Sequence, residues 1–254
     1  MNIRISTTNH ILRIELDRPR KKNAITSAMY STMAEILAAA EIDPEVRAIV
    51  IHGKSDVFTS GNDLDDFLNN PMLDQDAPAF RFLDTISHAS KPLLAAVTGA
   101  AVGIGTTLLL HCDFVYAGES AALQLPFVAL GLCPEAGSSY LLPRLAGHQR
   151  AAELLMLGEP VAAREAKAIG IVTDVRPDAE VIAYTLAQAT RLTRLPPASL
   201  KITKALMKRK ILPIVEHTMQ IEHEYFAACV ASPEAKEAFA AFFEKRKPDF
   251  SKFD

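Results

Sequence analysis

The distribution of apolar and polar residues predicts alternating strands and helices along the first two thirds of the chain. Short apolar runs bounded by glycine, proline or acidic residues are typical of strands buried on both faces. Longer stretches with an apolar residue every three or four positions predict amphipathic helices. Together they indicate an α/β fold. The strands are expected at Ile3–Ser6, Ile11–Leu16, Ala48–His52, Leu93–Val97, Phe114–Ala117, Ala121–Leu125 and Ile171–Val175.

The helices are expected between these strands. Thr26 is a suitable N-cap, because its hydroxyl can accept a hydrogen bond from the first helical turn, and the helix it begins runs to about Ala40. The stretch Asn69–Pro78 is polar and contains prolines, so we expect a loop there. The other helices of this region are expected at Leu64–Leu68, Ala79–His88, Thr106–His111, Ser138–Leu145, Gln149–Leu157 and Ala162–Ile169.

The pattern changes at Asp178, beyond which three or four helices separated by prolines fill the chain. We therefore predict an α/β core over residues 1–190 and a helical C-terminal region over residues 191–254. That region carries apolar side chains suited to packing on the core or on a neighbouring subunit, namely Ile214, Met219, Ile221, Tyr225 and Phe226.

Composition narrows the classes of partner. A chain of 254 residues is long enough for one large α/β domain or a core with a small appendage. The net charge of −3 provides no basic surface for nucleic acid or a membrane, and no apolar run approaches the roughly 20 residues that span a bilayer. The N-terminus lacks the apolar core of a signal peptide, and the cysteines are too widely spaced for a zinc or disulfide framework. We expect a cytoplasmic protein that binds neither nucleic acid nor a membrane.

The stretch Lys91–Cys112 combines a strand, a glycine-rich turn and a helix. Gly99, Gly103 and Gly105 lie within seven residues of one another. Such a turn leaves bare backbone N–H groups at a helix N-terminus, where they can bind an anion or a developing oxyanion. A turn that serves only packing would show the same pattern. Residues elsewhere in the chain must therefore distinguish an anion-binding turn from a packing turn.

Several kinds of chemistry lack their motifs. The turn at Gly103 has no third glycine for a dinucleotide and no following Gly-Lys-Ser/Thr for a phosphate loop. The Gly-x-Ser-x-Gly sequence of serine hydrolases is absent. His217 and His223 are six positions apart and do not share a helix face as metal ligands would. Metal chemistry, hydride transfer and serine hydrolysis are therefore disfavoured.

A second loop, FTSGNDL at Phe58–Leu64, also joins a strand to a helix. Gly61 allows a sharp turn that exposes the backbone N–H of Asn62, and Asp63 lies where the helix dipole favours a carboxylate. An ordinary strand-to-helix turn would look similar.

Three segments resemble the crotonase superfamily of acyl-CoA enzymes. They are FTSGNDL, KPLLAAVTGAAVGIG and LPFVALGLCPEAGSSYLLPRLAG, in this order, and the likeness extends over essentially the whole chain. Within the superfamily, SGNDL, AVGI and PEAGSSY are most similar to the 3,2-enoyl-CoA isomerases. The resemblance implies a spiral of ββα repeats with a helical C-terminal trimerisation region, and hence a homotrimer or a dimer of trimers.

The resemblance also implies an oxyanion hole. The backbone N–H groups of Asn62 and Ile104 would hold the thioester carbonyl of an acyl-CoA and stabilise its enolate. Coenzyme A is then part of the substrate, and no further cofactor is implied. Lys22 could alternatively be a solvated surface lysine with no role in binding. The implied lining of the acyl-CoA path is Lys22, Ala24, Ser60, Gly61, Asp63, Leu64, Gly103, Gly105 and Phe127.

The acid–base residue distinguishes the reactions of the superfamily. Hydratases use two glutamates, and the matching positions here hold Thr107 and Phe127, neither of which can accept a proton near neutral pH. Glu135, in PEAGSSY, matches the single glutamate base of the isomerases. Its apolar neighbours should raise its pKa, whereas the adjacent helix N-terminus should lower it. A plain first-turn helix residue is the alternative.

The resulting expectation is a 3,2-enoyl-CoA isomerase in which Glu135 moves a proton from C2 to C4. Two alternatives stay open: another crotonase-type reaction on a CoA thioester, such as hydration or thioester hydrolysis, and a non-catalytic acyl-CoA-binding role. The side chains expected to shape the acyl pocket are Phe67, Met72, Leu73 and Phe82.

Overall fold

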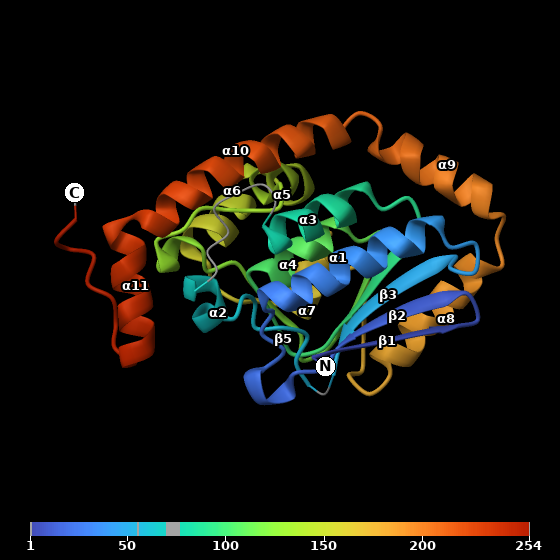
Figure 1. The fold of residues 1–254 in the computed structure, drawn as a ribbon, viewed down its shortest axis with the longest axis horizontal. Coiled ribbons are helices and arrows are strands. Elements are labelled where there is room, and N and C mark those ends of the chain that lie inside the picture. The colour runs from blue at the N-terminus through green and yellow to red at the C-terminus, as the bar shows by residue number, and fades with distance from the viewer. Residues whose placement is uncertain (1, 55, 70–76, 254) are drawn as a thin grey trace.

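A six-stranded sheet forms the centre of the computed structural model, which describes residues 2–54, 56–69 and 77–253 (Figure 1). The first two strands form the predicted antiparallel hairpin, and every later neighbour in the sheet is parallel. The strands, in their order across the sheet, are β1 (Ile3–Thr8), β2 (Ile11–Leu16), β3 (Ala48–Gly53), β4 (Leu93–Val97), β6 (Phe114–Gly118) and β9 (Asp174–Arg176).

The helices cover both faces of this sheet. The predicted cap is confirmed, because Thr26 Oγ1 accepts a hydrogen bond from the Met29 N–H (3.4 Å) at the start of the first helix. The α-helices are α1 (Ser27–Ile42), α2 (Leu64–Asn69), α3 (Pro78–His88), α4 (Ile104–Thr107), α5 (Ser138–Ala146), α6 (His148–Ala152), α7 (Ala163–Ala168), α8 (Val181–Thr193), α9 (Pro197–Lys208), α10 (Leu212–Ala231) and α11 (Pro233–Glu244). Short 3₁₀ segments occupy Pro19–Lys21, Leu108–His111 and Val128–Leu130, and a π-helical turn occupies Glu153–Leu157.

Strand β3 shows why the central strands are continuously apolar. All six of its residues are buried. Ile49 and Ile51 belong to the large core cluster shared with α1 and α3, whereas Ala48 and Val50 face the smaller cluster that includes residues of α8. Helix α8 lies on the opposite side of the sheet from α1 (Figure 1). A strand covered by helices on both faces cannot carry the alternating polar pattern of an exposed sheet.

A second, three-stranded sheet contains two strands that the sequence pattern did not predict. Strand β5 (Ala100–Val102) pairs in parallel with β7 (Ala122–Gln124), which pairs antiparallel with β8 (Val161–Ala162). Strands of two or three residues are too short to show a periodicity, and their partners lie far away in sequence. The expected glycine turn after β4 is therefore interrupted by a strand.

The expected strand at Ile171–Val175 is also wrong in its first half. The N–H groups of Ile171 and Val172 both donate to the Ala166 carbonyl and close the C-terminus of α7 (2.9 and 3.2 Å). They are thus committed to the helix end, and sheet pairing begins only at Asp174.

The C-terminal helices wrap around the core. Helix α10 lies across α3 and α5, and α11 leads to a C-terminus that projects from the body (Figure 1). Lys204 fastens α9 to the core, because its ammonium group donates to the Lys91 carbonyl (2.8 Å) and pairs with Asp113 (2.6 Å). The division of the chain at residue 190 stays a prediction.

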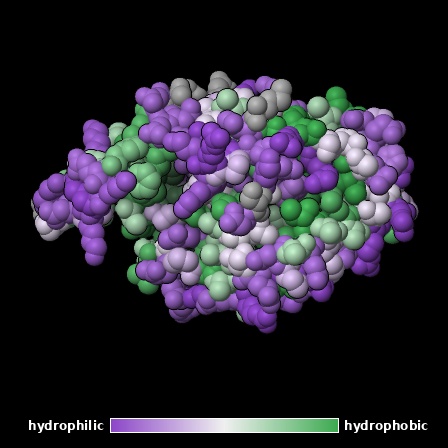
Figure 2. Space-filling view, turned by 90° about the horizontal axis from the view of Figure 1, so that it is seen from below, coloured by the Kyte–Doolittle hydropathy of each residue, from purple (hydrophilic) through white to green (hydrophobic). Residues whose placement is uncertain are grey.

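The faces of α10 separate the apolar residues noted in the sequence. Met219 and Phe226 are buried in the core, whereas Ile214, Ile221 and Tyr225 are exposed. Seen from below, apolar surface also gathers beside the projecting C-terminal end (Figure 2). Within the described residues, no helix is long and apolar enough to cross a membrane.

Candidate active site

The two loops recognised in the sequence are held together by short backbone bridges. Thr59 exchanges two hydrogen bonds with β5 (3.0 Å each), which join the first loop to the second. On its other side, the first loop accepts a bond from Ile25 through Gly61 (2.8 Å) and returns one through Asp63 (2.9 Å). Three segments that are distant in sequence therefore form one small ladder beside the start of α4.

Two glycines make this close approach possible. Gly61 has a φ of +90°, and a Cβ there would lie 2.8 Å from the Val102 carbonyl oxygen. A Cβ on Gly105 would lie 2.6 Å from Thr59 Cγ2. The structure thus gives Gly105 a packing role, and it does not line the large cavity described below.

The backbone N–H groups of Asn62 and Ile104 are free of hydrogen-bond acceptors in the part of the chain that the structure describes. Ile104 is the first residue of α4, where an N–H has no acceptor within the helix. The side chain of Asn62 is fixed from behind, because Tyr30 donates its hydroxyl proton to Asn62 Oδ1 (2.5 Å). Both residues line the same cavity.

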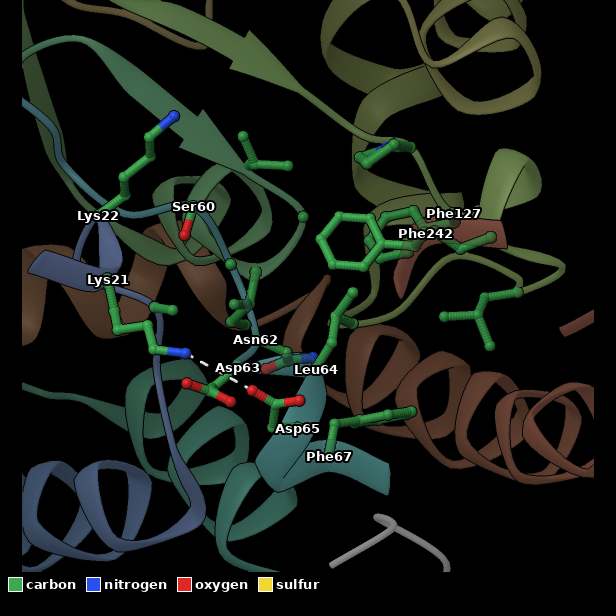
Figure 3. Close-up of a pocket in the computed structure, with 18 of the residues that line it drawn as sticks. Lys21, Lys22, Ser60, Asn62, Asp63, Leu64, Asp65, Phe67, Phe127 and Phe242 are labelled. Atoms are coloured by element: carbon green, nitrogen blue, oxygen red, sulfur yellow. Dashed lines mark ion pairs between the residues drawn. The ribbon is translucent and has the colours of Figure 1, made fainter. Parts of the chain in front are cut away.

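This cavity has a volume of about 640 Å³. Lys21, Lys22 and Ser60 lie at one end, and Phe127 and Phe242 lie at the other (Figure 3). Lys21 is paired with Asp65 at 3.5 Å. The cavity therefore has a basic end and an aromatic end. The expected site residues that line it are Lys22, Ala24, Ser60, Gly61, Asn62, Asp63, Leu64, Gly103, Ile104 and Phe127.

Asp63 is committed to the framework of the first loop. Its carboxylate pairs with Arg18 (2.6 Å) and accepts the Asp66 N–H (3.1 Å), which caps α2. Burial alone would raise its pKa, but these two partners outweigh burial and lower it. Asp63 therefore holds the loop in shape and remains charged.

Glu135 lies in a loop directly before α5 and is only 8% exposed. Burial raises its pKa to about 7, and a hydrogen bond from the Thr107 hydroxyl (3.3 Å) acts in the opposite direction. The nearby Glu222 carboxylate raises the pKa further. Burial, which the sequence was expected to provide through apolar neighbours, therefore has the largest effect on the pKa of Glu135.

Glu135 lines a smaller cavity of about 30 Å³ next to the large one. Phe226 lines both cavities, so its ring lies at the boundary between them. Of the expected acyl-pocket residues, Phe67 lines the large cavity. Phe82 does not line it and instead packs in the core against Tyr30, with ring centres 5.5 Å apart. The expectation for Phe82 is therefore wrong. Met72 and Leu73 fall outside the described residues.

Several residues that shape the site were missed. Tyr30 and Glu222 come from α1 and α10, far from the motifs in sequence, although a glutamate on the buried face of α10 between Met219 and Phe226 was a detectable anomaly. Asn23 is completely buried, accepts the Arg18 N–H (2.9 Å) and donates to the Val57 carbonyl (2.8 Å). It thereby ties the basic segment Asp17–Asn23 to the residues just before the loop Phe58–Leu64.

Backbone N–H groups that face a large cavity, and a buried carboxyl of raised pKa in the adjoining small cavity, are the kinds of group with which enzymes stabilise an oxyanion and move a proton. The chain belongs to the enoyl-CoA hydratase/isomerase family, whose model matches residues 6–252. It is thus a member of the crotonase superfamily, and acyl-CoA is the class of substrate that this family handles.

Relatives of both activities are similar to the chain. A 2,3-dehydroadipyl-CoA hydratase of Escherichia coli (strain K12) is 32% identical over 253 residues, which cover 97% of each chain. The enoyl-CoA delta isomerase 2 of Rattus norvegicus is 38% identical over 213 residues, which cover 82% of this chain but 54% of the rat protein.

Solved structures share the entire fold. An enoyl-CoA hydratase/isomerase from Pseudoalteromonas atlantica T6c superposes with a TM-score of 0.94 at 40% identity, over 98% of this chain and 100% of that one. Pseudomonas aeruginosa OdaA superposes with a TM-score of 0.93 at 45% identity, over 95% of this chain and 98% of that one. The expected crotonase-like α/β architecture with C-terminal helices is confirmed.

Proposed function

We propose that this protein is a 3,2-enoyl-CoA isomerase that converts a 3-enoyl-CoA into the 2-trans-enoyl-CoA. The observation that carries the proposal is the buried Glu135 carboxyl, whose pKa of about 7 suits a group that both accepts and returns a proton near neutral pH. Thr107 and Phe127 occupy the positions at which the superfamily resemblance places the two glutamates of hydratases.

In this proposal, Glu135 removes a proton from C2 of the acyl chain. The electrons of that C–H bond delocalise onto the thioester oxygen, which the N–H groups of Asn62 and Ile104 stabilise as an oxyanion. The dienolate then takes the same proton at C4, so the double bond moves from C3–C4 to C2–C3. One proton moves from C2 to C4, the electron pairs of the C2–H bond and the C3–C4 π bond become the C2–C3 π bond and the C4–H bond, and no net oxidation occurs. The reaction therefore needs no metal or redox cofactor.

The two ends of the cavity support an acyl-CoA as the ligand. The basic end with Lys21 and Lys22 suits the phosphates of coenzyme A, and the aromatic end with Phe67, Phe127 and Phe242 suits an apolar chain. A homotrimer or dimer of trimers, in the cytoplasm, is part of the same proposal. The apolar side chains exposed on α10 support a contact between subunits.

Hydration is the second candidate, because the Escherichia coli relative named as a hydratase matches over the full length of both chains. In that reaction Glu135 would have to activate a water molecule and also supply the proton, without the second carboxyl of the two-glutamate mechanism. We therefore expect hydration to be much slower than isomerisation.

The test compares isomerisation of 3-hexenoyl-CoA with hydration of crotonyl-CoA in three proteins. The wild type should isomerise faster than it hydrates, and Glu135→Gln should lose about 10³-fold in kcat, a typical effect of removing an acid–base group. Glu224→Gln, which removes an exposed carboxylate from α10, should behave as the wild type. Faster hydration, or an active Glu135→Gln, contradicts the proposal. Acyl-CoA binding without turnover of either substrate favours a non-catalytic role.

A further inference from the structure

Helix α5 begins three residues after Glu135, and its N-terminus could interfere with the base. The free N–H groups and the dipole of a helix N-terminus stabilise a nearby carboxylate. If they bonded to the Glu135 side chain, they would favour its ionised form and make it a poor proton acceptor. The acceptors to which these N–H groups bond therefore affect how readily Glu135 accepts a proton.

The N–H groups are taken by another residue. The carboxylate of Glu222, which is 6% exposed, accepts the N–H groups of Gly137 (2.6 Å) and Ser139 (2.9 Å) and also the Ser139 hydroxyl (2.5 Å). The Ser138 N–H and hydroxyl bond to the backbone carbonyl of Glu135 (3.0 and 2.6 Å) and so fix its main chain.

The Glu135 side chain is thus left with a single hydrogen-bond partner among the described residues, the Thr107 hydroxyl. Glu222 lines the same small cavity as Glu135, and the two carboxyl groups are close enough to interact electrostatically. The other buried residues near Glu222 on this face of α10 are apolar, namely Met219 and Phe226. A buried charge is costly unless it has such a specific task.

We propose that Glu222 is a positioning residue for the base. By capping α5, it keeps the helix N–H groups away from Glu135, and its own negative charge disfavours a second charge on that side chain. This inference rests on the proposed role of Glu135. It assigns Glu222 no contact with the substrate.

Other groups near Glu135 could also affect its titration. Tyr30 from α1 interacts with it electrostatically, and burial raises the pKa of that phenol, so Tyr30 stays neutral. His111 Nε2 donates to the Ala136 carbonyl (2.8 Å), and burial lowers the pKa of His111 to about 4, which leaves it uncharged near pH 7. His223 on α10 lines the small cavity. His223→Gln therefore serves as a further control.

The first test needs no substrate. The protein is labelled with ¹³C at the glutamate carboxyl groups, and the Glu135 signal is assigned by its loss in Glu135→Gln. In Glu222→Gln, the titration midpoint of Glu135 should move to lower pH by about one unit, because a like charge and a cap are lost. Glu224→Gln removes an equal charge from the exposed face of α10 and should leave the midpoint unchanged. An unmoved midpoint in a folded Glu222→Gln overturns the inference.

The wild type alone supplies a second criterion if Glu222→Gln does not fold. Burial raises the pKa of Glu222 as well, but its carboxylate accepts three hydrogen bonds that lower the pKa, whereas Glu135 accepts one. Glu222 should therefore lose its proton at lower pH than Glu135. The reverse order overturns the inference. The acidic limb of kcat/KM against pH for 3-hexenoyl-CoA should follow the Glu135 midpoint in each variant. If the wild type does not isomerise this substrate, the proposed function fails, while the ¹³C titrations still decide the role of Glu222.

Discussion

The stability of Glu135→Gln should increase relative to that of the wild type as the pH rises. The pKa of Glu135 lies at about 7 in the folded protein, against an ordinary value of 4.5. Because the folded pKa is raised, burial of the neutral acid contributes stability below about pH 4.5, and that stability is lost as the pH rises through 7. Glutamine is neutral at every pH and can still accept the hydrogen bond from Thr107.

The magnitude follows from the size of the shift. The raised pKa corresponds to about 2.5 pH units, and each unit is worth about 1.36 kcal/mol, so the full effect is about 3 kcal/mol. From pH 5 to pH 8.5, the free energy of unfolding of Glu135→Gln, relative to that of the wild type, should increase by about 2–3 kcal/mol. The constant cost of burying a glutamine amide cancels, because only the change with pH is compared.

The assay is urea denaturation of both proteins at one protein concentration and several pH values. Glu224→Gln, with its exposed carboxylate, should show no such trend. A difference between Glu135→Gln and the wild type that stays constant from pH 5 to pH 8.5 would refute the claim that Glu135 is a buried acid of raised pKa.

Three further changes test the loops and the cavity. Ile104→Pro removes one proposed oxyanion donor at the first helical position, where proline is tolerated, so kcat should fall about 10²- to 10³-fold. Ile104→Val keeps the N–H and should stay active, and equal activity of the two variants would contradict the role of this N–H. Tyr30→Phe removes the donor that holds Asn62 Oδ1, so kcat/KM should fall about tenfold; an unchanged rate would show that the Asn62 side chain needs no support. Lys22→Ala should raise KM for acyl-CoA about threefold at constant kcat, with a smaller effect at high salt. A change in kcat with KM unaltered would contradict a role of Lys22 in binding the substrate.

Contiguous motifs carried most of what could be predicted from the sequence. The strands β3 and β4 and the helix cap at Thr26 follow from local patterns, and the structure confirms them. The loops around Asn62 and Ile104 could be placed beside one cavity because their segments resemble those of a known superfamily. The assignment of these residues to an oxyanion hole stays a prediction.

The missing parts depend on contacts between distant segments. Strand β5 forms because Thr59 and β7 supply its hydrogen-bond partners. Its three residues are too few to show a pattern from which the strand could be predicted. Glu222 acts on a helix end that belongs to another part of the chain. Phe82 was expected to shape the acyl pocket, but the packing of α3 against α1 places it in the core.

Transfer of an isotopic label tests the central claim most directly. The substrate is 3-hexenoyl-CoA carrying deuterium at C2, and the product is analysed for deuterium at C4. Because Glu135 is buried, we expect it to return part of the deuterium to the substrate before the deuteron exchanges with water. The account thus predicts 2-trans-hexenoyl-CoA with part of the label at C4, and loss of this product in Glu135→Gln. Product without deuterium at C4, or 3-hydroxyhexanoyl-CoA as the main product, would contradict a single buried base that shuttles one proton.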